Sequence, residues 1–202
     1  MSLSNCEKFE RLLDLRKNAF LNGEPILREQ SYNLLLKLVK ENKPKKILEI
    51  GTNVGVSGIS MLLCSEKASL STIEIDEEKI KQARENFIKF GVENRAKIFI
   101  GDAGQIIPLL SGEYDFIFLD GPKGHYFEYL QNLLPILQVG GILFADNVLF
   151  RGYVNGKVKT PHRFNTTKHS MENFLRELQQ NKNLQTDVYD IEDGVSVTKR
   201  LK

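Results

Sequence analysis

Two amphipathic helices are predicted in the first 44 residues. Over residues 4–21, apolar side chains recur among charged ones at spacings typical of one helical face: Phe9, Leu12, Leu13, Leu15 and Phe20. The run Asn22–Pro25 interrupts this pattern. A second amphipathic helix is expected over about residues 27–40, where leucine and valine cluster, and it should end at Lys43 and Pro44.

From residue 45 onward, short apolar runs alternate with helical patterns. The apolar runs predict strands at 47–50, 70–75, 96–100, 115–119, 142–145, 185–191 and 195–199. Helices are expected at about 56–63, 77–90, 103–110, 126–137 and 168–180. The short link Glu192–Gly194 predicts that the last two strands form an antiparallel hairpin. The expected fold class is α/β: a doubly wound, Rossmann-like, seven-stranded, mostly parallel sheet with a C-terminal antiparallel hairpin.

The stretch from Lys45 to Ser57 is the strongest local signal for ligand binding. A short strand, a turn containing Gly51 and Gly55, and a helix follow one another, and this arrangement brings backbone N–H groups close to a nucleotide. The dinucleotide motif GxGxxG is not matched, because Asn53 occupies the position of its second glycine. Glu49, just before the first glycine, favours a ligand with a cationic end over a pyrophosphate.

Length and composition narrow the class of protein. With 202 residues, 41% hydrophobic and 27% charged, the chain is expected to form one soluble globular domain over residues 1–202, with N-terminal helices at 1–44 and an α/β core at 45–202. The net charge of +2 selects no partner. Cys6 and Cys64 are expected to be reduced thiols. No signal peptide or membrane-spanning run is evident, so a cytoplasmic location is expected.

Acidic residues follow several predicted strands, where ligands bind in parallel sheets. Glu74 lies 23 positions after Gly51, close to the spacing of the acid that binds ribose hydroxyls in nucleotide folds. Its alternative role is a solvated helix-start charge shared with Asp76 and Glu77. Asp102 is placed to accept a hydrogen bond from an adenine amino group, or to cap the short helix that follows. Both roles for Asp102 stay open.

A second set of polar residues follows two later strands. Asp120, Asp146 and Asn147 offer oxygen ligands of the kind that Mg²⁺ and Ca²⁺ prefer. Alternatively, Asp120 caps a helix and the other two begin an ordinary loop. Lys123 is a candidate general base, because a nearby divalent cation would lower its pKa; without those acids it would be a surface lysine in a turn. His125 is the second candidate for the base.

The segment 148–171 contains no Asp or Glu but several basic residues: Arg151, Lys157, Lys159, Arg163 and Lys168, with His162 and His169. A basic loop at the mouth of a site favours an anionic substrate, with Arg151 and Arg163 as the candidate substrate contacts. Tyr153 and Phe164 are placed to stack on a base. The alternative is a solvated loop whose charge balances acids elsewhere.

Together these residues resemble the metal-dependent class I O-methyltransferases, the family of catechol and caffeoyl-CoA O-methyltransferases. The resemblance covers about residues 25–200 and rests on five motifs in order: 47–57 (ILEIGTNVGVS), 73–76 (IEID), 101–103 (GDA), 116–123 (FIFLDGPK) and 145–149 (ADNVL). Within the family, 146–152 (DNVLFRG) and 193–199 (DGVSVTK) look most like the bacterial tRNA 5-hydroxyuridine methyltransferases.

The resemblance implies S-adenosylmethionine as cofactor and a homodimer as the assembly. The cofactor would lie along Leu27 of the second helix, Glu49, Gly51, Ser57, Glu74, Asp102, Ala103 and Asp120. Asp120, Asp146 and Asn147 would bind Mg²⁺, and Lys123 would be the base. Gly121 and Pro122 replace the bulkier pair of some relatives, so an aromatic wall for catechol rings is expected to be missing.

The expected reaction is methyl transfer to a hydroxyl that lies next to a second oxygen, as in 5-hydroxyuridine at the tRNA wobble position. A catechol or caffeoyl-CoA-like small molecule presents the same pair of oxygens and is the alternative acceptor. Two other functions stay open from the sequence. An RNA-binding protein without catalysis would not need Lys123 and the three oxygen ligands, and a nicotinamide-dependent oxidoreductase would be expected to carry GxGxxG.

Overall fold

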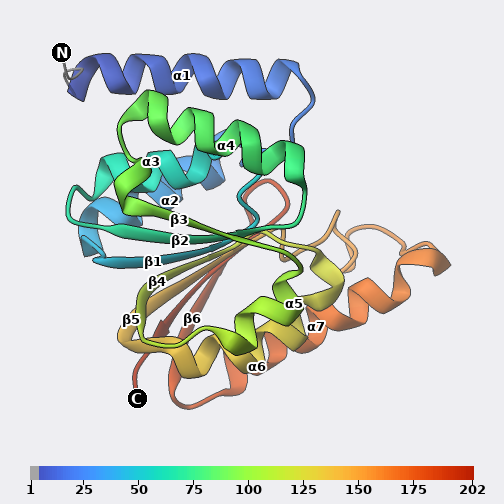
Figure 1. Ribbon diagram of the computed structural model, residues 1–202. Coiled ribbons are helices and arrows are strands. Elements are labelled where there is room, and N and C mark those ends of the chain that lie inside the picture. Colours follow the sequence, from blue (N-terminus) through green and yellow to red (C-terminus); the bar gives the residue numbers. More distant parts are fainter. Residues whose placement is uncertain (1–4) are drawn as a thin grey trace. The chain divides into compact units, whose positions relative to one another are not determined.

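The computed structural model describes residues 5–202, and their side chains from residue 7 onward (Figure 1). The chain forms two compact units, one that ends at Asp102 and one that runs from Ala103 to Lys202. Each unit contains parallel strands with helices packed against them.

The N-terminal unit holds three parallel strands in the order β3-β2-β1. Its elements are α1 (Asn5–Leu21), α2 (Glu29–Asn42), β1 (Lys46–Ile50), α3 (Val56–Cys64), β2 (Ser69–Glu74), α4 (Glu77–Phe90), a 3₁₀ turn η1 (Glu93–Arg95) and β3 (Ala96–Ile100). Helices α1 and α2 both pack against α3, which packs against β2. The register pairs Ile50 with Ile73, and Glu74 with Ile100, so the carboxyl ends of the strands are level.

The C-terminal unit combines a parallel pair with an antiparallel hairpin. Its elements are α5 (Ala103–Ile106), η2 (Ile107–Leu109), β4 (Tyr114–Leu119), η3 (Lys123–His125), α6 (Tyr126–Ile136), β5 (Leu137–Asp146), η4 (His162–Phe164), α7 (Asn165–Gln180), β6 (Leu184–Tyr189) and β7 (Val195–Arg200). Strand β4 pairs parallel with β5, and β7 pairs antiparallel with both β5 and β6. Helices α6 and α7 pack together.

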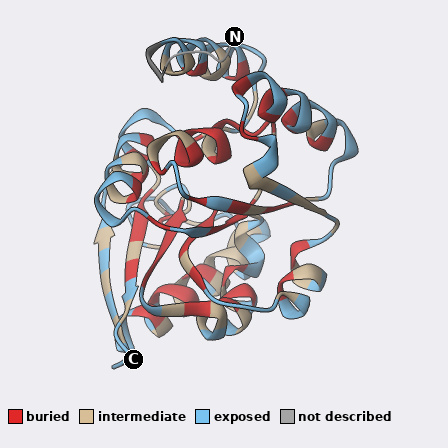
Figure 2. Ribbon diagram, turned by 60° about the vertical axis from the view of Figure 1, so that its left-hand side comes forward, coloured by how far each residue is buried: buried red, intermediate tan, exposed pale blue. Residues whose placement is uncertain are grey.

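The seven strands have the order β3-β2-β1-β4-β5-β7-β6. The predicted fold class, a seven-stranded, mostly parallel α/β sheet with a C-terminal hairpin, is confirmed. In Figure 2 the buried residues gather on the strands and on the faces of the helices that pack against them. Ile47, Leu48 and Ile50 in β1 are almost fully buried, as expected for a strand covered on both faces.

Helix α1 differs from its predicted face. Leu12 is buried, but Leu13 and Phe20 are 64% and 72% exposed. The buried face follows Leu12, Leu15 and Ala19, which recur at helical spacing and point toward the rest of the unit. The prediction placed Leu13 and Phe20 on the buried face of the helix because the number of apolar residues does not fix which face is buried.

Several boundaries also differ from the prediction by a few residues, and two of these differences involve glycines or site residues named above. Gly140 and Gly141 were expected before the fifth strand but lie within β5, which begins at Leu137. A register shift near Tyr114 on the neighbouring strand accommodates this longer β5. Leu27 was expected in the second helix but lies in the link before α2, where it is buried. Cys64 is a free thiol, whereas the side chain of Cys6 lies outside the described residues. No helix in residues 5–202 is long and apolar enough to cross a membrane.

Candidate active site

The glycine turn after β1 has the backbone geometry that its sequence predicts. Gly51 and Gly55 have φ of +97° and +85°, in the left-handed region that glycine adopts without strain. Gly55 is the N-cap of α3, and a Cβ there would lie 2.9 Å from a ring carbon of Phe87. The turn is therefore tight because α4 packs directly against it.

Glu49 and Ser57, both predicted to bind the cofactor, contact each other beside this turn. The Ser57 hydroxyl donates to Oε1 of Glu49, and the Thr72 hydroxyl donates to Oε2 at 2.7 Å. The Glu49 side chain is fully buried at the end of β1. Gly58 leaves room for it, since a Cβ at that position would lie 3.0 Å from Oε2. A buried carboxylate held by hydroxyls keeps acceptor capacity for a cationic group.

Glu74 is held by backbone groups at the end of β2. Its Oε2 accepts from the Asn53 amide at 2.8 Å, and its Oε1 accepts from the Ile75 and Asp76 amides at 2.9 and 3.0 Å. Asp76, not Glu74, caps α4, because its Oδ1 accepts from the Glu78 and Lys79 amides. One carboxylate oxygen of Glu74 thus faces the glycine turn and the other faces the start of α4, and the ribose role stays a prediction.

The other predicted cofactor residues are divided between the two units. Leu27, 5% exposed, belongs to the N-terminal unit and lies in the link before α2. Asp102 is exposed at the end of the same unit, and Ala103 is buried at the start of the next. Their cofactor roles stay predictions.

The predicted metal ligands and base meet at the ends of β4 and β5 in the C-terminal unit. Asp120 follows β4, and Asp146 ends β5, which is its parallel neighbour. The Lys123 ammonium lies 2.7 Å from Asp120 Oδ1, and both side chains are only about one-fifth exposed. Asn147 follows Asp146 with φ of +56°. The structure therefore brings together four residues that the sequence singled out.

The charges in this cluster perturb one another. Burial, and next the neighbouring Asp120, raise the pKa of Asp146 to about 7. Burial lowers the pKa of Lys123, but Tyr126 and Asp120 raise it more, so that it ends above its usual range. The expected lowering of the Lys123 pKa is not what this arrangement produces, because the prediction assumed a cation beside it and the ion pair with Asp120 favours the ammonium form.

The donor set suits a hard divalent cation. It offers two carboxylates and an amide, oxygen ligands of the kind that such ions prefer. Burial first, and then the charge of Asp120, raise the pKa of Asp146, and a bound cation would oppose both effects. Among residues 5–202, no group of three or more His, Cys, Asp or Glu is placed to hold a metal ion. The residues present fit Mg²⁺, whose binding stays a prediction.

Sequence reasoning missed Tyr126. Its fully buried hydroxyl lies 3.1 Å from the carbonyl oxygen of Leu119 and 3.1 Å from that of Asp146, and donates to these two strand ends. Its ring lies beneath the Lys123 ammonium at 5.3 Å. In the sequence, Tyr126 stands out only as an aromatic residue three positions after Lys123, and the helical pattern assigns such a residue to the core. His125, the second candidate for the base, is instead exposed, pairs with Glu128 and stacks on Tyr129.

The loop after Asn147 is fastened to the turn between β6 and β7. The amides of Val148 and Leu149 donate to the carbonyls of Gly194 and Asp193 at 3.0 and 2.9 Å, and the Arg151 amide donates to the Asp193 carboxylate. A Cβ at Gly194 would lie 2.3 Å from Leu149, so only glycine fits there. The two motifs that carried the narrower resemblance, 146–152 and 193–199, are thus in direct contact.

Three aromatic rings in this loop support the two predicted substrate arginines. Phe150, Tyr153 and Phe164 pack with centroids 5.5 to 5.7 Å apart. The exposed guanidinium groups of Arg151 and Arg163 lie 5.5 and 4.8 Å from the centroid of Phe164. Lys157 instead pairs with Asp190, and Lys168 with Glu172. Lys157 and Lys168 therefore balance nearby acids, as the alternative predicted, whereas Arg151 and Arg163 form an exposed positive surface.

Known proteins share the sequence and the fold. A family model described as O-methyltransferase matches residues 3–201. A caffeoyl-CoA O-methyltransferase from Stellaria longipes is 30% identical over 158 residues, which are 72% of this chain and 64% of that protein. A catechol O-methyltransferase from Niastella koreensis is 36% identical over 115 residues, 54% of this chain and 52% of that protein. Each match spans less than two thirds of the relative's own length.

A solved structure agrees with these matches. The crystal structure of the methyltransferase PaMTH1 from Podospora anserina, bound to S-adenosylhomocysteine (SAH), has a TM-score of 0.81 at 26% identity and covers 98% of this chain and 88% of that one. The predicted enzyme class, S-adenosylmethionine-dependent O-methyltransferase, is confirmed at the level of the family. Because the family model matches nearly the whole of this chain, residues 3–201, the chain belongs to the O-methyltransferase family.

Proposed function

We propose that this protein transfers the methyl group of S-adenosylmethionine to a hydroxyl that neighbours a second oxygen on a small acceptor of the catechol or caffeoyl-CoA kind. The observation that carries the proposal is the cluster of Asp120, Lys123 and Asp146 at two adjacent strand ends. The names of the two relatives support the class of acceptor.

The N-terminal unit is proposed to hold most of the cofactor. Glu74, oriented by three backbone amides, would accept from the ribose hydroxyls. Glu49 and Ser57 would receive the cationic methionine end beside Gly51. Leu27, Asp102, Ala103 and Asp120 are proposed as further contacts, as the family resemblance implies. The structure of PaMTH1 with SAH bound supports a site for this cofactor in the shared fold.

Asp120, Asp146 and Asn147 are proposed to hold Mg²⁺ or another hard divalent cation. When bound, such an ion lowers the pKa of a hydroxyl next to it. Lys123 is proposed to accept the proton of the acceptor hydroxyl. Its pKa is raised by its partner Asp120 among other groups, so engagement of that carboxylate elsewhere would bring the lysine closer to the neutral form that a base needs.

A second acceptor, 5-hydroxyuridine in tRNA, is favoured by one observation. Arg151 and Arg163 flank the Phe164 ring on the exposed loop, and a basic surface with aromatic rings suits a nucleotide and its phosphates. Caffeoyl-CoA also carries phosphates, so the same surface serves the first proposal. The homodimer implied by the family resemblance likewise stays a proposal.

The test is methyl transfer from labelled S-adenosylmethionine in the presence of Mg²⁺, with catechol, caffeoyl-CoA and hypomodified tRNA offered separately. Label in a small molecule, lost in Lys123→Met, supports the first proposal. Label only in tRNA, and lost when the wobble hydroxyl is absent, supports the second acceptor. Binding of SAH by Lys123→Met is the control that this variant folds. No transfer to any of the three, by a protein that binds SAH, would contradict both proposals.

A further inference from the structure

The link Glu24–Leu27, here called the strap, crosses the glycine turn before α2 begins. Ile26 packs against an apolar cluster that includes Val54 of the turn, Val56 at the start of α3 and Ala19 of α1. Leu27, 5% exposed, is one of the proposed cofactor contacts. The strap thus packs directly against the residues of the turn.

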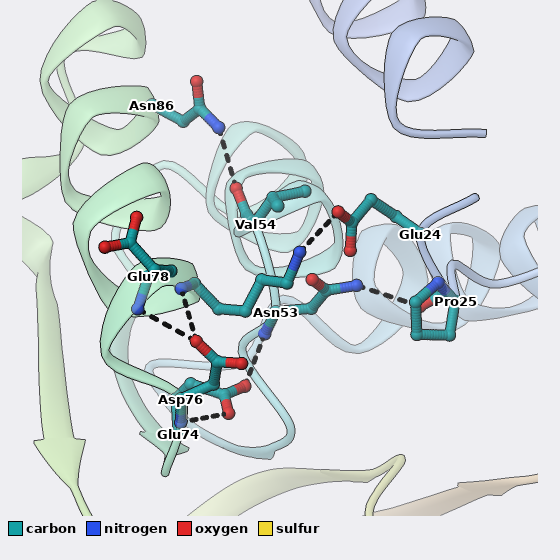
Figure 3. A network of polar contacts seen from close by, with 9 residues as sticks. Glu24, Pro25, Asn53, Val54, Glu74, Asp76, Glu78 and Asn86 are labelled. Atoms are coloured by element: carbon teal, nitrogen blue, oxygen red, sulfur yellow. Dashed lines mark hydrogen bonds and ion pairs between the residues drawn. The ribbon is translucent and has the colours of Figure 1, made fainter. Parts of the chain in front are cut away.

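Besides the Glu24 amide, which donates to the Ala19 carbonyl of α1, two side-chain contacts fasten the strap. The Lys79 ammonium of α4 pairs with the Glu24 carboxylate, and their side chains are only 27% and 14% exposed. Asn53 Nδ2 donates to the Pro25 carbonyl at 3.2 Å. Figure 3 shows Asn53 between Pro25 on one side and Glu74 on the other, with Asn86 donating to the Val54 carbonyl beside it.

Asn53 links the strap to the proposed ribose acid. Its side chain contacts Pro25, while its backbone amide donates to Glu74 at 2.8 Å. A displacement of the strap would therefore act on one of the three residues whose backbone amides orient Glu74. The same residue has φ of +47°, a conformation in which glycine would be unstrained.

The side-chain amide of Asn53 lowers the stability of the fold. Its Oδ1 is buried, and no hydrogen-bond donor within residues 5–202 reaches it. A buried acceptor without a donor costs free energy, and a non-glycine residue at positive φ adds to that cost. Glycine at position 53 would avoid both costs, so the fold alone does not explain the asparagine.

We propose that Asn53 and the Glu24–Lys79 ion pair are positioning elements that hold the strap closed and so retain S-adenosylmethionine. The inference rests on the proposed function, because it assumes that the cofactor occupies the N-terminal unit beside Glu74. It assigns a role to three residues outside the set proposed to touch the cofactor.

The decisive variant is Asn53→Gly, which keeps the backbone amide and the positive φ but removes the contact to Pro25. The loss of one hydrogen bond is expected to raise the dissociation rate of SAH about three- to tenfold, with a matching rise in its Kd. The melting temperature is expected to stay the same or rise. A merely structural role would instead lower the melting temperature.

Lys79→Met tests the second fastening point, and Lys81→Met, at an exposed position of the same helix, is its matched control. We expect faster SAH release from the first variant only, with partial recovery in the charge-exchanged double variant Glu24→Lys, Lys79→Glu. Stopped-flow release and calorimetry give the rates and affinities, and the KM for S-adenosylmethionine should rise more than kcat falls.

The outcomes separate the two proposals. Release rates of Asn53→Gly and Lys79→Met equal to those of the unaltered protein would overturn the strap inference and leave the proposed function standing. Equal acceleration by Lys81→Met would also overturn it, because the effect would then be one of net charge. Failure of the unaltered protein to bind SAH would overturn the proposed function, and the strap inference with it.

Discussion

At the scale of single residues, Asp146 shows how burial and a neighbouring acid set the chemistry of a carboxyl. Its folded pKa of about 7 lies above the unfolded value of about 3.9, so the folded state prefers the protonated form. This contribution to stability is fully present below about pH 4 and is lost as the pH rises through about 7. In the absence of metal, the ionisation of Asp146 is therefore expected to make the protein less stable at pH 8 than at pH 4.

Asp146→Asn should remove that penalty. In EDTA, the variant is expected to be more stable than the unaltered protein at pH 8 by on the order of 2–4 kcal/mol, and nearly equal to it at pH 4. Urea unfolding at the two pH values measures the difference. An Asp146→Asn variant that is less stable at pH 8 would show that the carboxylate is compensated by contacts other than those described.

Tyr126 is the residue that joins the two strand ends. Tyr126→Phe leaves the Leu119 and Asp146 carbonyls without their buried donor, which should cost about 1–3 kcal/mol of unfolding free energy. Because the hydroxyl also fixes the backbone at Asp146, we expect kcat to fall more than the KM for S-adenosylmethionine changes. Tyr189→Phe, at an exposed position, should change neither. A normal kcat in Tyr126→Phe would show that Tyr126 contributes to stability and not to turnover.

At the scale of elements, the β6–β7 turn and the loop after β5 form one structure. Gly194 has φ of +83° and no room for a Cβ beside Leu149. Their separation in sequence is long, so neither the hydrophobic pattern nor the turn signals predicted this contact. The turn positions the start of the basic loop, and with it the backbone of Arg151.

Gly194→Ala should therefore be more harmful than an ordinary glycine substitution. Gly140→Ala is its matched control, since Gly140 also has φ of +83° but no atom within 4 Å of a Cβ. The control is expected to lose about 1 kcal/mol from backbone strain, and Gly194→Ala a further ~1–3 kcal/mol from the overlap with Leu149. Thermal unfolding of both variants measures the difference. Equal losses would show that Leu149 moves aside without cost.

At the scale of the whole molecule, the proposed reaction needs both the cofactor and a divalent cation. EDTA is expected to abolish methyl transfer while leaving SAH binding within about twofold, and added Mg²⁺ should restore turnover. Mg²⁺ should also raise the melting temperature of the unaltered protein but not that of Asp146→Asn, because ligand binding to the folded state stabilises it. Full activity in EDTA would contradict the metal proposal.

The sequence predicted much of this molecule because its signals are local. Strand and helix patterns, the glycine turn and the acids at strand ends each depend on residues within a few positions of one another, and the parallel topology then places those ends along one edge. Lys123 with Asp120, and Glu49 with Ser57, lie close in the chain, so their pairing was within reach of sequence reasoning. The single-domain organisation and the homodimer stay predictions.

Only the tertiary structure decided how distant segments act on these residues. The phase of α1, the fit of Gly194 against Leu149, the Tyr126 bridge and the strap contact at Asn53 all depend on packing between different segments. The paired residues in the last three lie 7 to 45 positions apart. It also decided the protonation preferences of Lys123 and Asp146, because a pKa depends on burial and on the distance between charges. The local sequence pattern does not give the burial of a side chain or the distance between two charges, whereas the folded chain determines both.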